Sequence, residues 1–230
     1  MRPHTICHMV TSIDGRTLGS RWSPGGIDMG ALFERVHDDR LGGGSWIVGR
    51  VTGDEFAKGE AYPQSSETFA REDHIAAKDA GTYGIVLDAH GKIAWGMKEI
   101  GGDPIVVVLT ETVSDSHIAG LRADGVSYIF AGRDALDLAL ALTKLKSLLG
   151  LDRLLIEGGG GANGAFLRAG LVDEISLVIA PAVDGRDGAP SMFHGSEEAG
   201  KAPVEAIELL SHETIEGGAV WLRYKVRNRV

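Results

Sequence analysis

Short β-branched runs alternate with helical segments along most of this chain, and that alternation restricts its fold more than any other feature. Residues 84–87 and 105–109 are compact runs of Ile, Val and Leu, which is typical of strands buried on both faces. Segments such as 29–40 and 134–149 carry apolar residues at helical spacing. Strands that alternate with helices usually form a parallel sheet covered by the helices. The sequence therefore predicts an α/β fold with a mostly parallel central sheet.

The remaining elements follow from the same two periodicities. Asp28 and Ser114 stand where a side chain caps a helix, and Gly150 stands where one ends. From residue 174 the comparable helices stop, and the last two strand-like runs are expected to form an antiparallel pair at the edge of the sheet. The predicted strands are residues 6–10, 45–48, 84–87, 105–109, 126–130, 151–156, 175–180, 204–210 and 219–226, and the predicted helices are residues 29–40, 114–123, 134–149 and 162–169.

Bulk properties restrict the partners and the compartment. Without a repeat or a linker, residues 1–230 are expected to form a single domain. The formal net charge of -9 disfavours nucleic acid and anionic membranes, which both require a basic surface. No apolar stretch approaches the roughly 20 residues of a membrane helix, and no secretory signal opens the sequence. Cys7 lies in an apolar run, so a reducing, cytoplasmic location fits.

The most specific local motif is a strand that runs directly into glycines. Residues 151–156 are followed by Glu157 and then by four glycines at 158–161, after which a helix is predicted. Backbone N–H groups at such a turn suit a diphosphate, because no side chain blocks the helix N-terminus. The alternative is a tight strand-to-helix turn without a ligand. The spacing Gly159-x-Gly161-x-x-Gly164 also fits a loose dinucleotide fingerprint, but little helical sequence follows, which disfavours a Rossmann fold.

A second strand ends in glycine at Gly49 and is followed by Arg50 and Thr52. Arg50 suits a phosphate oxygen, and Thr52 is expected to cap a short helix while its N–H donates to the ligand. The alternative is a capped helix with a solvated arginine. A dinucleotide that lies across strand ends needs phosphate donors from more than one loop, so each turn strengthens the case for the other.

Two residues near the first strand are candidates for the reaction itself. Asp14 follows that strand in an Asp-Gly turn, where a carboxylate can orient a substrate or assist proton transfer. Asp-Gly turns without any function are also common. Trp22 lies in a predicted loop, where it either covers a planar ring or simply packs against the protein.

Metal and nucleophile sites are not expected. His4 and His8 are four residues apart on a strand, hence roughly 13 Å apart, too far to share one ion. The sequence has no Gly-x-Ser-x-Gly elbow and no His-Glu-x-x-His motif.

Four motifs together resemble the reductase domain of bacterial riboflavin-biosynthesis deaminase-reductases, which has the dihydrofolate reductase fold. They are Ser12-Ile13-Asp14-Gly15, Gly49-Arg50-x-Thr52, Ile156-Glu157-Gly158-Gly159 and Gly170-Leu171-Val172-Asp173-Glu174. The resemblance spans nearly the whole chain in the same order. It implies an NADPH-dependent reductase that reduces the ribosyl C1′ of a diaminopyrimidinone ribosylamino phosphate, and it implies a homodimer.

The expected site residues combine these motifs with the resemblance. Asp14 and Glu157 are the candidates for proton transfer, and the sequence does not decide between them. Lys92 aligns with a basic position expected near the cofactor 2′-phosphate. The cofactor-binding residues are predicted to be Val10, Trp22, Gly49, Arg50, Thr52, Lys92, Gly158, Gly159, Gly160, Gly161, Ala162, Asn163, Gly164 and Ala165, and the substrate-binding residues Ser12, Ser20, Arg40 and Glu157.

The sequence also departs from that family in two places. His8 replaces a lysine that usually precedes the Ser-x-Asp-Gly turn, and the usual Asp-x-Pro-x-Leu segment is missing after Thr52. No zinc deaminase signature occurs, so a free-standing reductase is expected. Three hypotheses follow: the riboflavin-pathway reductase, a related NADPH reductase of another heterocyclic or carbonyl substrate, and a nucleotide-binding module without catalysis.

Overall fold

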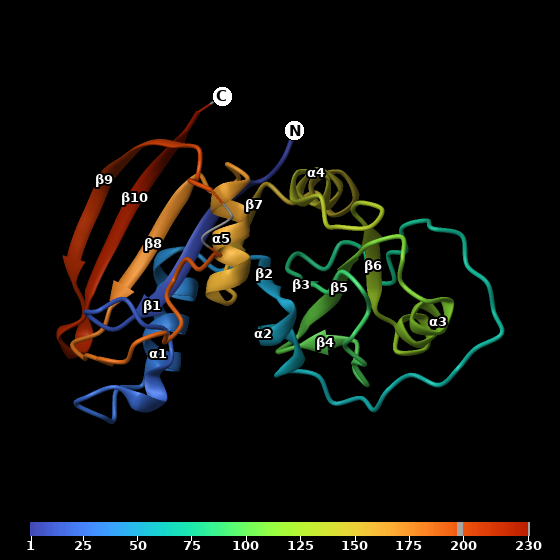
Figure 1. The fold of residues 1–230 in the computed structure, drawn as a ribbon, viewed down its shortest axis with the longest axis horizontal. Helices are drawn as coiled ribbons and strands as arrows, with labels where there is room; N and C mark the ends of the chain where they lie inside the picture. Colours follow the sequence, from blue (N-terminus) through green and yellow to red (C-terminus); the bar gives the residue numbers. More distant parts are fainter. Residues whose placement is uncertain (197–199, 230) are drawn as a thin grey trace. The chain divides into compact units, whose positions relative to one another are not determined.

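The structure is a computed structural model that describes residues 1–196 and 200–229, and the chain forms two compact units in it (Figure 1). The first unit comprises Met1–His4 and Gly44–Leu154, and the second comprises Thr5–Gly43 and Leu155–Val230. The expectation that residues 1–230 form a single domain stays a prediction.

The first unit is built on parallel strands, as predicted. Ile85 pairs with Val106, and Val106 pairs in turn with Ser127. One short strand that the sequence did not predict, β4 (Glu99–Ile100), pairs antiparallel with the start of β5. The parallel strands are, in their order across the sheet, β2 (Trp46–Gly49), β3 (Gly84–Leu87), β5 (Asp103–Leu109) and β6 (Ser127–Phe130).

Two helices of this unit show where side chains set helix ends. Helix α3 (Asp115–Ala123) begins after Ser114, whose side chain accepts the His117 N–H as predicted. Helix α4 (Leu138–Leu149) begins four residues later than predicted, because Asp137 accepts the Leu140 N–H at 2.9 Å and caps the helix there. Gly150 ends α4 in the left-handed region, with φ 71°, as its position predicted.

Strand and helix side chains together form the core of the first unit. Strand β3 is buried along its whole length, and β5 is buried from Ile105 onward, as their apolar runs predicted. Each such side chain contributes about 1.5–3 kcal/mol when it leaves water. The core cluster consists of Val48, Val86, Ile93, Trp95, Ile105, Val107, Leu109, Val113, Ile118, Leu121, Val126, Tyr128 and Phe130.

The second unit combines one parallel and two antiparallel strand pairings. Val10 of β1 (His4–Thr11) pairs with Val178 of the parallel strand β8 (Glu174–Ile179). Strand β10 (Val220–Asn228) runs antiparallel to both β8 and β9 (Val204–Thr214), so the predicted C-terminal antiparallel pair is confirmed. These strands lie side by side in the order β1, β8, β10 and β9 (Figure 1).

Helical segments complete the second unit. The predicted helix 29–40 is present, and Asp28 caps it by accepting the Ala31 N–H. Only α1 (Met29–Arg35) is α-helical, since the segment η2 (Val36–Arg40) continues as a π-helix. The chain enters this unit again within β7 (Arg153–Ile156), which leads into α5 (Gly160–Arg168), two residues earlier than predicted.

The predicted fold class is confirmed: helices accompany a mostly parallel set of strands, and an antiparallel hairpin ends the chain. Within the described residues, every helix is too short or too polar to cross a bilayer.

Candidate active site

An open pocket of about 510 Å³ lies at the carboxyl ends of strands in the first unit, and it contains two of the predicted cofactor residues. Arg50 follows the end of β2, and Lys92 follows the end of β3. Both side chains line the pocket, together with Leu87, Asp88, Ala89, His90 and Leu136. Carboxyl ends of parallel strands are the usual place for ligands in such sheets. Two cations in one pocket there suit a phosphate.

Asp88 fixes the loop that carries Lys92. Its carboxylate is fully buried and accepts the backbone N–H groups of Lys92 at 2.7 Å and Ile93 at 2.9 Å. The loop is therefore held from inside by two charge-assisted hydrogen bonds, while the exposed Lys92 side chain lies at the pocket.

The helix after β2 differs in one detail from the expectation. Helix α2 (Arg50–Asp54) begins directly after Gly49, which caps it without a side-chain hydrogen bond. The prediction that Thr52 caps this helix is wrong, because residue 52 already lies inside its first turn. Gly53 is required for packing, since a Cβ there would lie 2.4 Å from Val86. The N–H groups of the first turn still lack partners within the helix, which suits an anion.

In the second unit, the glycines of residues 158–164 are needed for backbone conformation and for close packing. Gly159 has φ 53° and ψ 136°, a backbone conformation that L-residues with side chains rarely adopt. A Cβ on Gly160 would lie 2.1 Å from the Ser191 carbonyl oxygen, and one on Gly164 would lie 2.1 Å from the His194 carbonyl oxygen. These two glycines therefore let residues 191–194 pack against α5, which is the structural alternative considered for this motif.

Gly161 differs from its neighbours, because a Cβ there would have no heavy atom within 4 Å. It lies in the first turn of α5 and is exposed. Asn163 is fully buried and donates to the Met192 carbonyl at 3.0 Å, so its side chain serves packing. Of the predicted segment 158–165, the surface at Gly161 thus remains open to a ligand. Gly158 is buried, whereas Ala162 and Ala165 are partly exposed.

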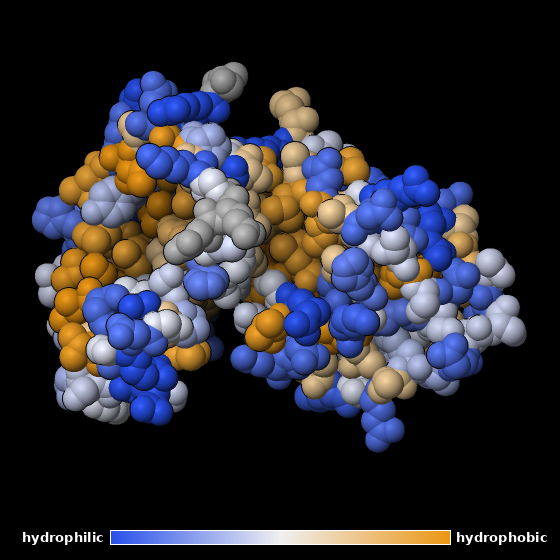
Figure 2. Space-filling model, in the orientation of Figure 1, coloured by the Kyte–Doolittle hydropathy of each residue, from blue (hydrophilic) through white to orange (hydrophobic). Residues whose placement is uncertain are grey.

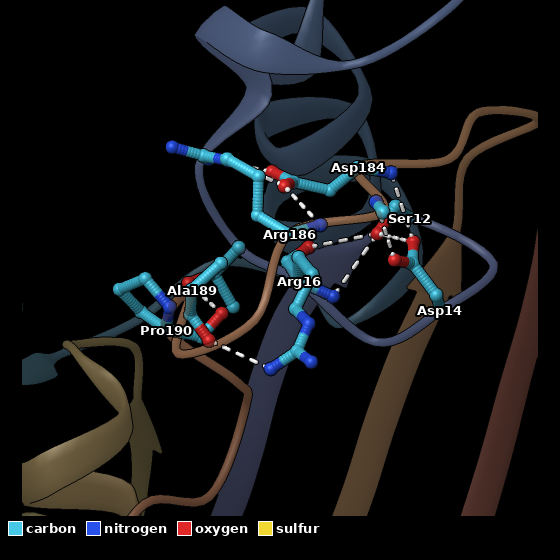
Figure 3. A network of polar contacts seen from close by, with 9 residues as sticks. Ser12, Asp14, Arg16, Asp184, Arg186, Ala189 and Pro190 are labelled. Atoms are coloured by element: carbon cyan, nitrogen blue, oxygen red, sulfur yellow. Dashed lines mark hydrogen bonds and ion pairs between the residues drawn. The ribbon is translucent and has the colours of Figure 1, made fainter.

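Asp14 is the centre of a polar network in the second unit (Figure 3). Its two carboxylate oxygens accept the backbone N–H groups of Asp184 at 3.0 Å and Gly185 at 2.9 Å, and the Ser12 hydroxyl at 2.7 Å. These donors, the Asp184 N–H first, hold the pKa of the Asp14 carboxyl well below its usual range. Asp184 in turn forms a two-pronged ion pair with Arg186. Asp14 is therefore ionised at neutral pH and joins the turn after β1 to the loop after β8.

Glu157, the other predicted carboxylate, has a different environment. Its Oε1 lies 2.6 Å from Nδ1 of His37, and the two side chains are only 6% and 14% exposed. Sequence reasoning did not single out His37, which lies 120 residues away in the chain. No spacing rule links the two positions, so only the fold reveals this pair.

The remaining predicted residues are spread over the second unit. Val10 and Trp22 are buried, at 2% and 5% exposure, and in the described structure the Trp22 indole N–H has no hydrogen-bond partner. Ser20 is exposed on the short 3-10 helix η1 (Gly19–Arg21). Arg40 forms an ion pair with Glu213 and places its guanidinium carbon 5.3 Å from the centre of the Trp221 ring.

His8, which stands where the resemblance places a lysine, is buried and uncharged at neutral pH. Burial lowers the pKa of His8 to about 4, despite hydrogen bonds to the carbonyls of Phe33 and Ser176. Position 8 thus supplies no positive charge to a substrate. Burial also raises the pKa of the Cys7 thiol, with a smaller contribution from Glu157, so Cys7 is an unreactive core residue.

A family model for the RibD C-terminal domain matches residues 3–221. The chain belongs to this family. Two curated proteins, both named 2,5-diamino-6-ribosylamino-4(3H)-pyrimidinone 5′-phosphate reductase, match over their full length. The one from Methanothermobacter thermautotrophicus is 28% identical over 99% of this chain and 100% of its own length. The one from Aquifex aeolicus is 23% identical over 100% of this chain and 99% of its own length.

Solved structures show the same fold. A pyrimidine reductase-like protein from Corynebacterium diphtheriae aligns with a TM-score of 0.70 and 18% identity, covering 99% of this chain and 93% of that one. RibD from Acinetobacter baumannii aligns with a TM-score of 0.62 and 22% identity, covering 98% of this chain and 58% of that one. A riboflavin biosynthesis reductase from Saccharomyces cerevisiae aligns with a TM-score of 0.61 and 16% identity, covering 98% and 90% of the two chains. The expected dihydrofolate-reductase-like fold is confirmed.

Proposed function

We propose that this chain is an NADPH-dependent reductase that transfers a hydride to the ribosyl C1′ of a diaminopyrimidinone ribosylamino phosphate. The observation that carries the proposal is the pocket with Arg50 and Lys92 at the carboxyl ends of β2 and β3. It occurs in a chain whose full-length relatives are named for this reduction. Two cations there suit the phosphate that distinguishes NADPH from NADH.

Each unit, taken by itself, has residues that suit a phosphate group of such a cofactor. Arg50 and Lys92 would bind phosphate at the pocket, and the open backbone at Gly161 would admit a diphosphate to the N-terminus of α5. When bound, NADPH supplies the hydride. The protein contributes binding, orientation and exclusion of water.

The two carboxylates take different roles in this proposal. Asp14 has both oxygens occupied by hydrogen-bond donors and a lowered pKa, so it holds the turn beside the substrate residues and does not deliver a proton. Glu157 is the carboxylate that moves a proton at the substrate nitrogen. Ser12, Ser20 and Arg40 remain the proposed substrate contacts.

A related reductase of another heterocyclic or carbonyl substrate is the second candidate. The buried, uncharged His8 favours it, because the positive charge that a lysine would place at position 8 is missing. The ribose-phosphate end of the expected substrate would then need another cation, and Arg40 is already paired with Glu213.

The test is turnover with purified protein. NADPH and NADH binding are first measured by titration calorimetry, and oxidation of the preferred coenzyme is then followed with the diaminopyrimidinone substrate. Tight NADPH binding with substrate-dependent oxidation supports the proposal. Saturable NADPH binding without oxidation would favour the second candidate, and no binding of either coenzyme would reject both, along with a nucleotide-binding module.

We also propose that two copies of the chain associate through the sheet of the second unit. Figure 2 shows apolar surface over the C-terminal strands of this unit, where Ile207 and Leu209 are each 53% exposed. Tyr224 and Leu177 line a shallow apolar hollow of about 460 Å³ on the same strands. Contiguous apolar surface of this kind is typical of protein interfaces.

A further inference from the structure

The contact between His37 and Glu157 has the geometry of a group that shares a proton. The two atoms, Nδ1 and Oε1, are 2.6 Å apart, which is short for an uncharged N–H···O hydrogen bond and typical of a charge-assisted one. An ionised carboxylate only accepts hydrogen bonds, so the imidazole Nδ1–H must donate to it. In the alternative state, a protonated Glu157 donates to the neutral ring. Either way, the pair holds one proton between its two atoms.

The backbone around His37 is unusual in the same place. Residues Val36–Arg40 form a π-helix, closed by a 2.8 Å hydrogen bond from the Leu41 N–H to the Val36 carbonyl. π-Helical turns are rare and occur mostly at functional sites, because the extra residue per turn changes the direction of the side chains. Here the π-turn begins one residue before His37, after a regular α-helix that ends at Arg35.

Several charged or titratable groups surround the pair. From β1, His8 interacts electrostatically with His37, and the Cys7 thiol interacts with the Glu157 carboxylate. From the π-helix itself, Asp38 has an oxygen 3.8 Å from Nε2 of His37, but its side chain is 71% exposed and solvent screens it. Glu157 is therefore the buried charged partner of the imidazole.

We propose that His37 is a positioning residue for Glu157, which it holds by the Nδ1 hydrogen bond and with which it shares the proton used in the reduction. This inference rests on the proposed function. The imine carbon of the substrate would accept a hydride, which bound NADPH would supply on its oxidation to NADP⁺. The C=N π electrons pass to the nitrogen, which accepts the proton from Glu157. That proton is the one the pair shares: it reaches the nitrogen from Nδ1 of His37 by way of Glu157, which leaves a neutral His37 and an ionised Glu157, and solvent then restores one proton to the pair.

The first arm of the test needs neither cofactor nor substrate. The ring nitrogens of His37 are titrated by ¹⁵N NMR in the wild-type protein and in Glu157→Gln. Loss of the carboxylate removes the group that stabilises the imidazolium, so the titration midpoint of His37 should fall by about one pH unit in the variant. Equal midpoints in the two proteins would overturn the proposal, whatever the substrate is.

The second arm measures steady-state kinetics over pH with NADPH and the diaminopyrimidinone substrate. His37→Asn keeps an N–H donor near the Nδ1 position but carries no transferable proton, whereas His37→Leu loses both. We expect kcat to fall about 10-fold in His37→Asn and about 100-fold in His37→Leu, with the KM for NADPH unchanged. In both variants the plot of kcat against pH should lose the change in kcat that the titration of the His37–Glu157 pair causes in the wild type.

Asp38→Asn is the matched control, since it changes the neighbouring residue of the same π-turn and should leave kcat within about 2-fold of wild type. Equal kcat losses in the two His37 variants, or an unchanged pH profile, would overturn the proposal. If wild type itself shows no turnover, the proposed function fails while the NMR arm still decides the pairing. If His37→Leu does not fold, His37→Asn and the NMR arm carry the test.

Discussion

Gly164→Ala should destabilise the protein, although alanine favours a helix and glycine does not. Gly164 lies inside α5, and a Cβ there would be 2.1 Å from the His194 carbonyl oxygen. Ordinary contacts of a Cβ begin at 3.4 Å, so residues 191–194 would have to move away from the helix by more than about 1 Å. Gly161→Ala is the matched control, because the same change in the same helix meets no atom within 4 Å.

The size of the effect follows from the contacts that such a movement would break. His194 donates its N–H to the Gly160 carbonyl at 2.8 Å, and Asn163 donates to the Met192 carbonyl at 3.0 Å. Each hydrogen bond contributes about 0.5–1.5 kcal/mol, so losing both costs about 1–3 kcal/mol. The better helix propensity of alanine offsets up to about 1 kcal/mol of this loss. Gly161→Ala gains the same propensity without the loss, so the gain cancels and the two variants should differ by about 1–3 kcal/mol.

Urea unfolding and thermal unfolding of the two variants measure this difference. In a chain of this length, about 1–3 kcal/mol corresponds to a gap of roughly 2–12 °C in Tm. If Gly164→Ala unfolds at the same urea concentration as Gly161→Ala, residues 191–194 do not pack against α5 as described. The two packing glycines would then have to be explained by ligand binding.

Four other predictions test the site. Gly161→Asp should weaken NADPH binding at least 30-fold, measured by calorimetry, because its charge repels the diphosphate, whereas the isosteric Gly161→Asn should not. Equal NADPH affinities of the two variants would mean that α5 does not bind the cofactor. Lys92→Gln should weaken NADPH binding about 10-fold and leave NADH binding unchanged, and equal losses for both would move the 2′-phosphate elsewhere. Because the folded-state pKa of Asp14 is lowered, its ionised form stabilises the fold above pH 4, and that contribution disappears as the pH falls further. Asp14→Asn should therefore lower Tm at pH 7 and make Tm decline less steeply below pH 4. An unchanged dependence of Tm on pH would contradict this. Leu209→Glu should shift the protein toward monomer in light scattering, and a wild-type protein that is already monomeric would refute association through this face.

Periodicity predicted the elements well because it reports burial directly. The runs at 84–87 and 105–109 are strands in a parallel sheet, and the caps at Asp28 and Ser114 accept the expected N–H groups. The start of α4 was misplaced because two aspartates, at positions 134 and 137, are equally good caps in sequence. The tertiary structure selects Asp137.

The site was less predictable, because its decisive contacts join residues far apart in the chain. Four adjacent glycines look alike in a sequence, yet only the position of residues 191–194 separates the packing role of Gly160 from the open surface at Gly161. His37 carried no signal, because its partner is 120 residues away and its π-helical turn cannot be distinguished from an α-helix by spacing alone. Arg50, by contrast, was found from the sequence because it directly follows a recognisable strand, whereas Lys92 was found through the family resemblance.

The two carboxylates show how environment divides roles that residue type leaves equal. Asp14 accepts three hydrogen bonds, which stabilise its ionised form so strongly that it cannot release or take up a proton near neutral pH. Glu157 is instead almost fully buried, with its Oε1 2.6 Å from Nδ1 of His37, and imidazole is the side chain that most often exchanges a proton near neutral pH. If the reduction is limited by proton transfer, its pH dependence must therefore originate in the Glu157 pair. If Asp14→Asn changes the pH dependence of kcat and Glu157→Gln leaves it unchanged, the two carboxylates have the opposite roles.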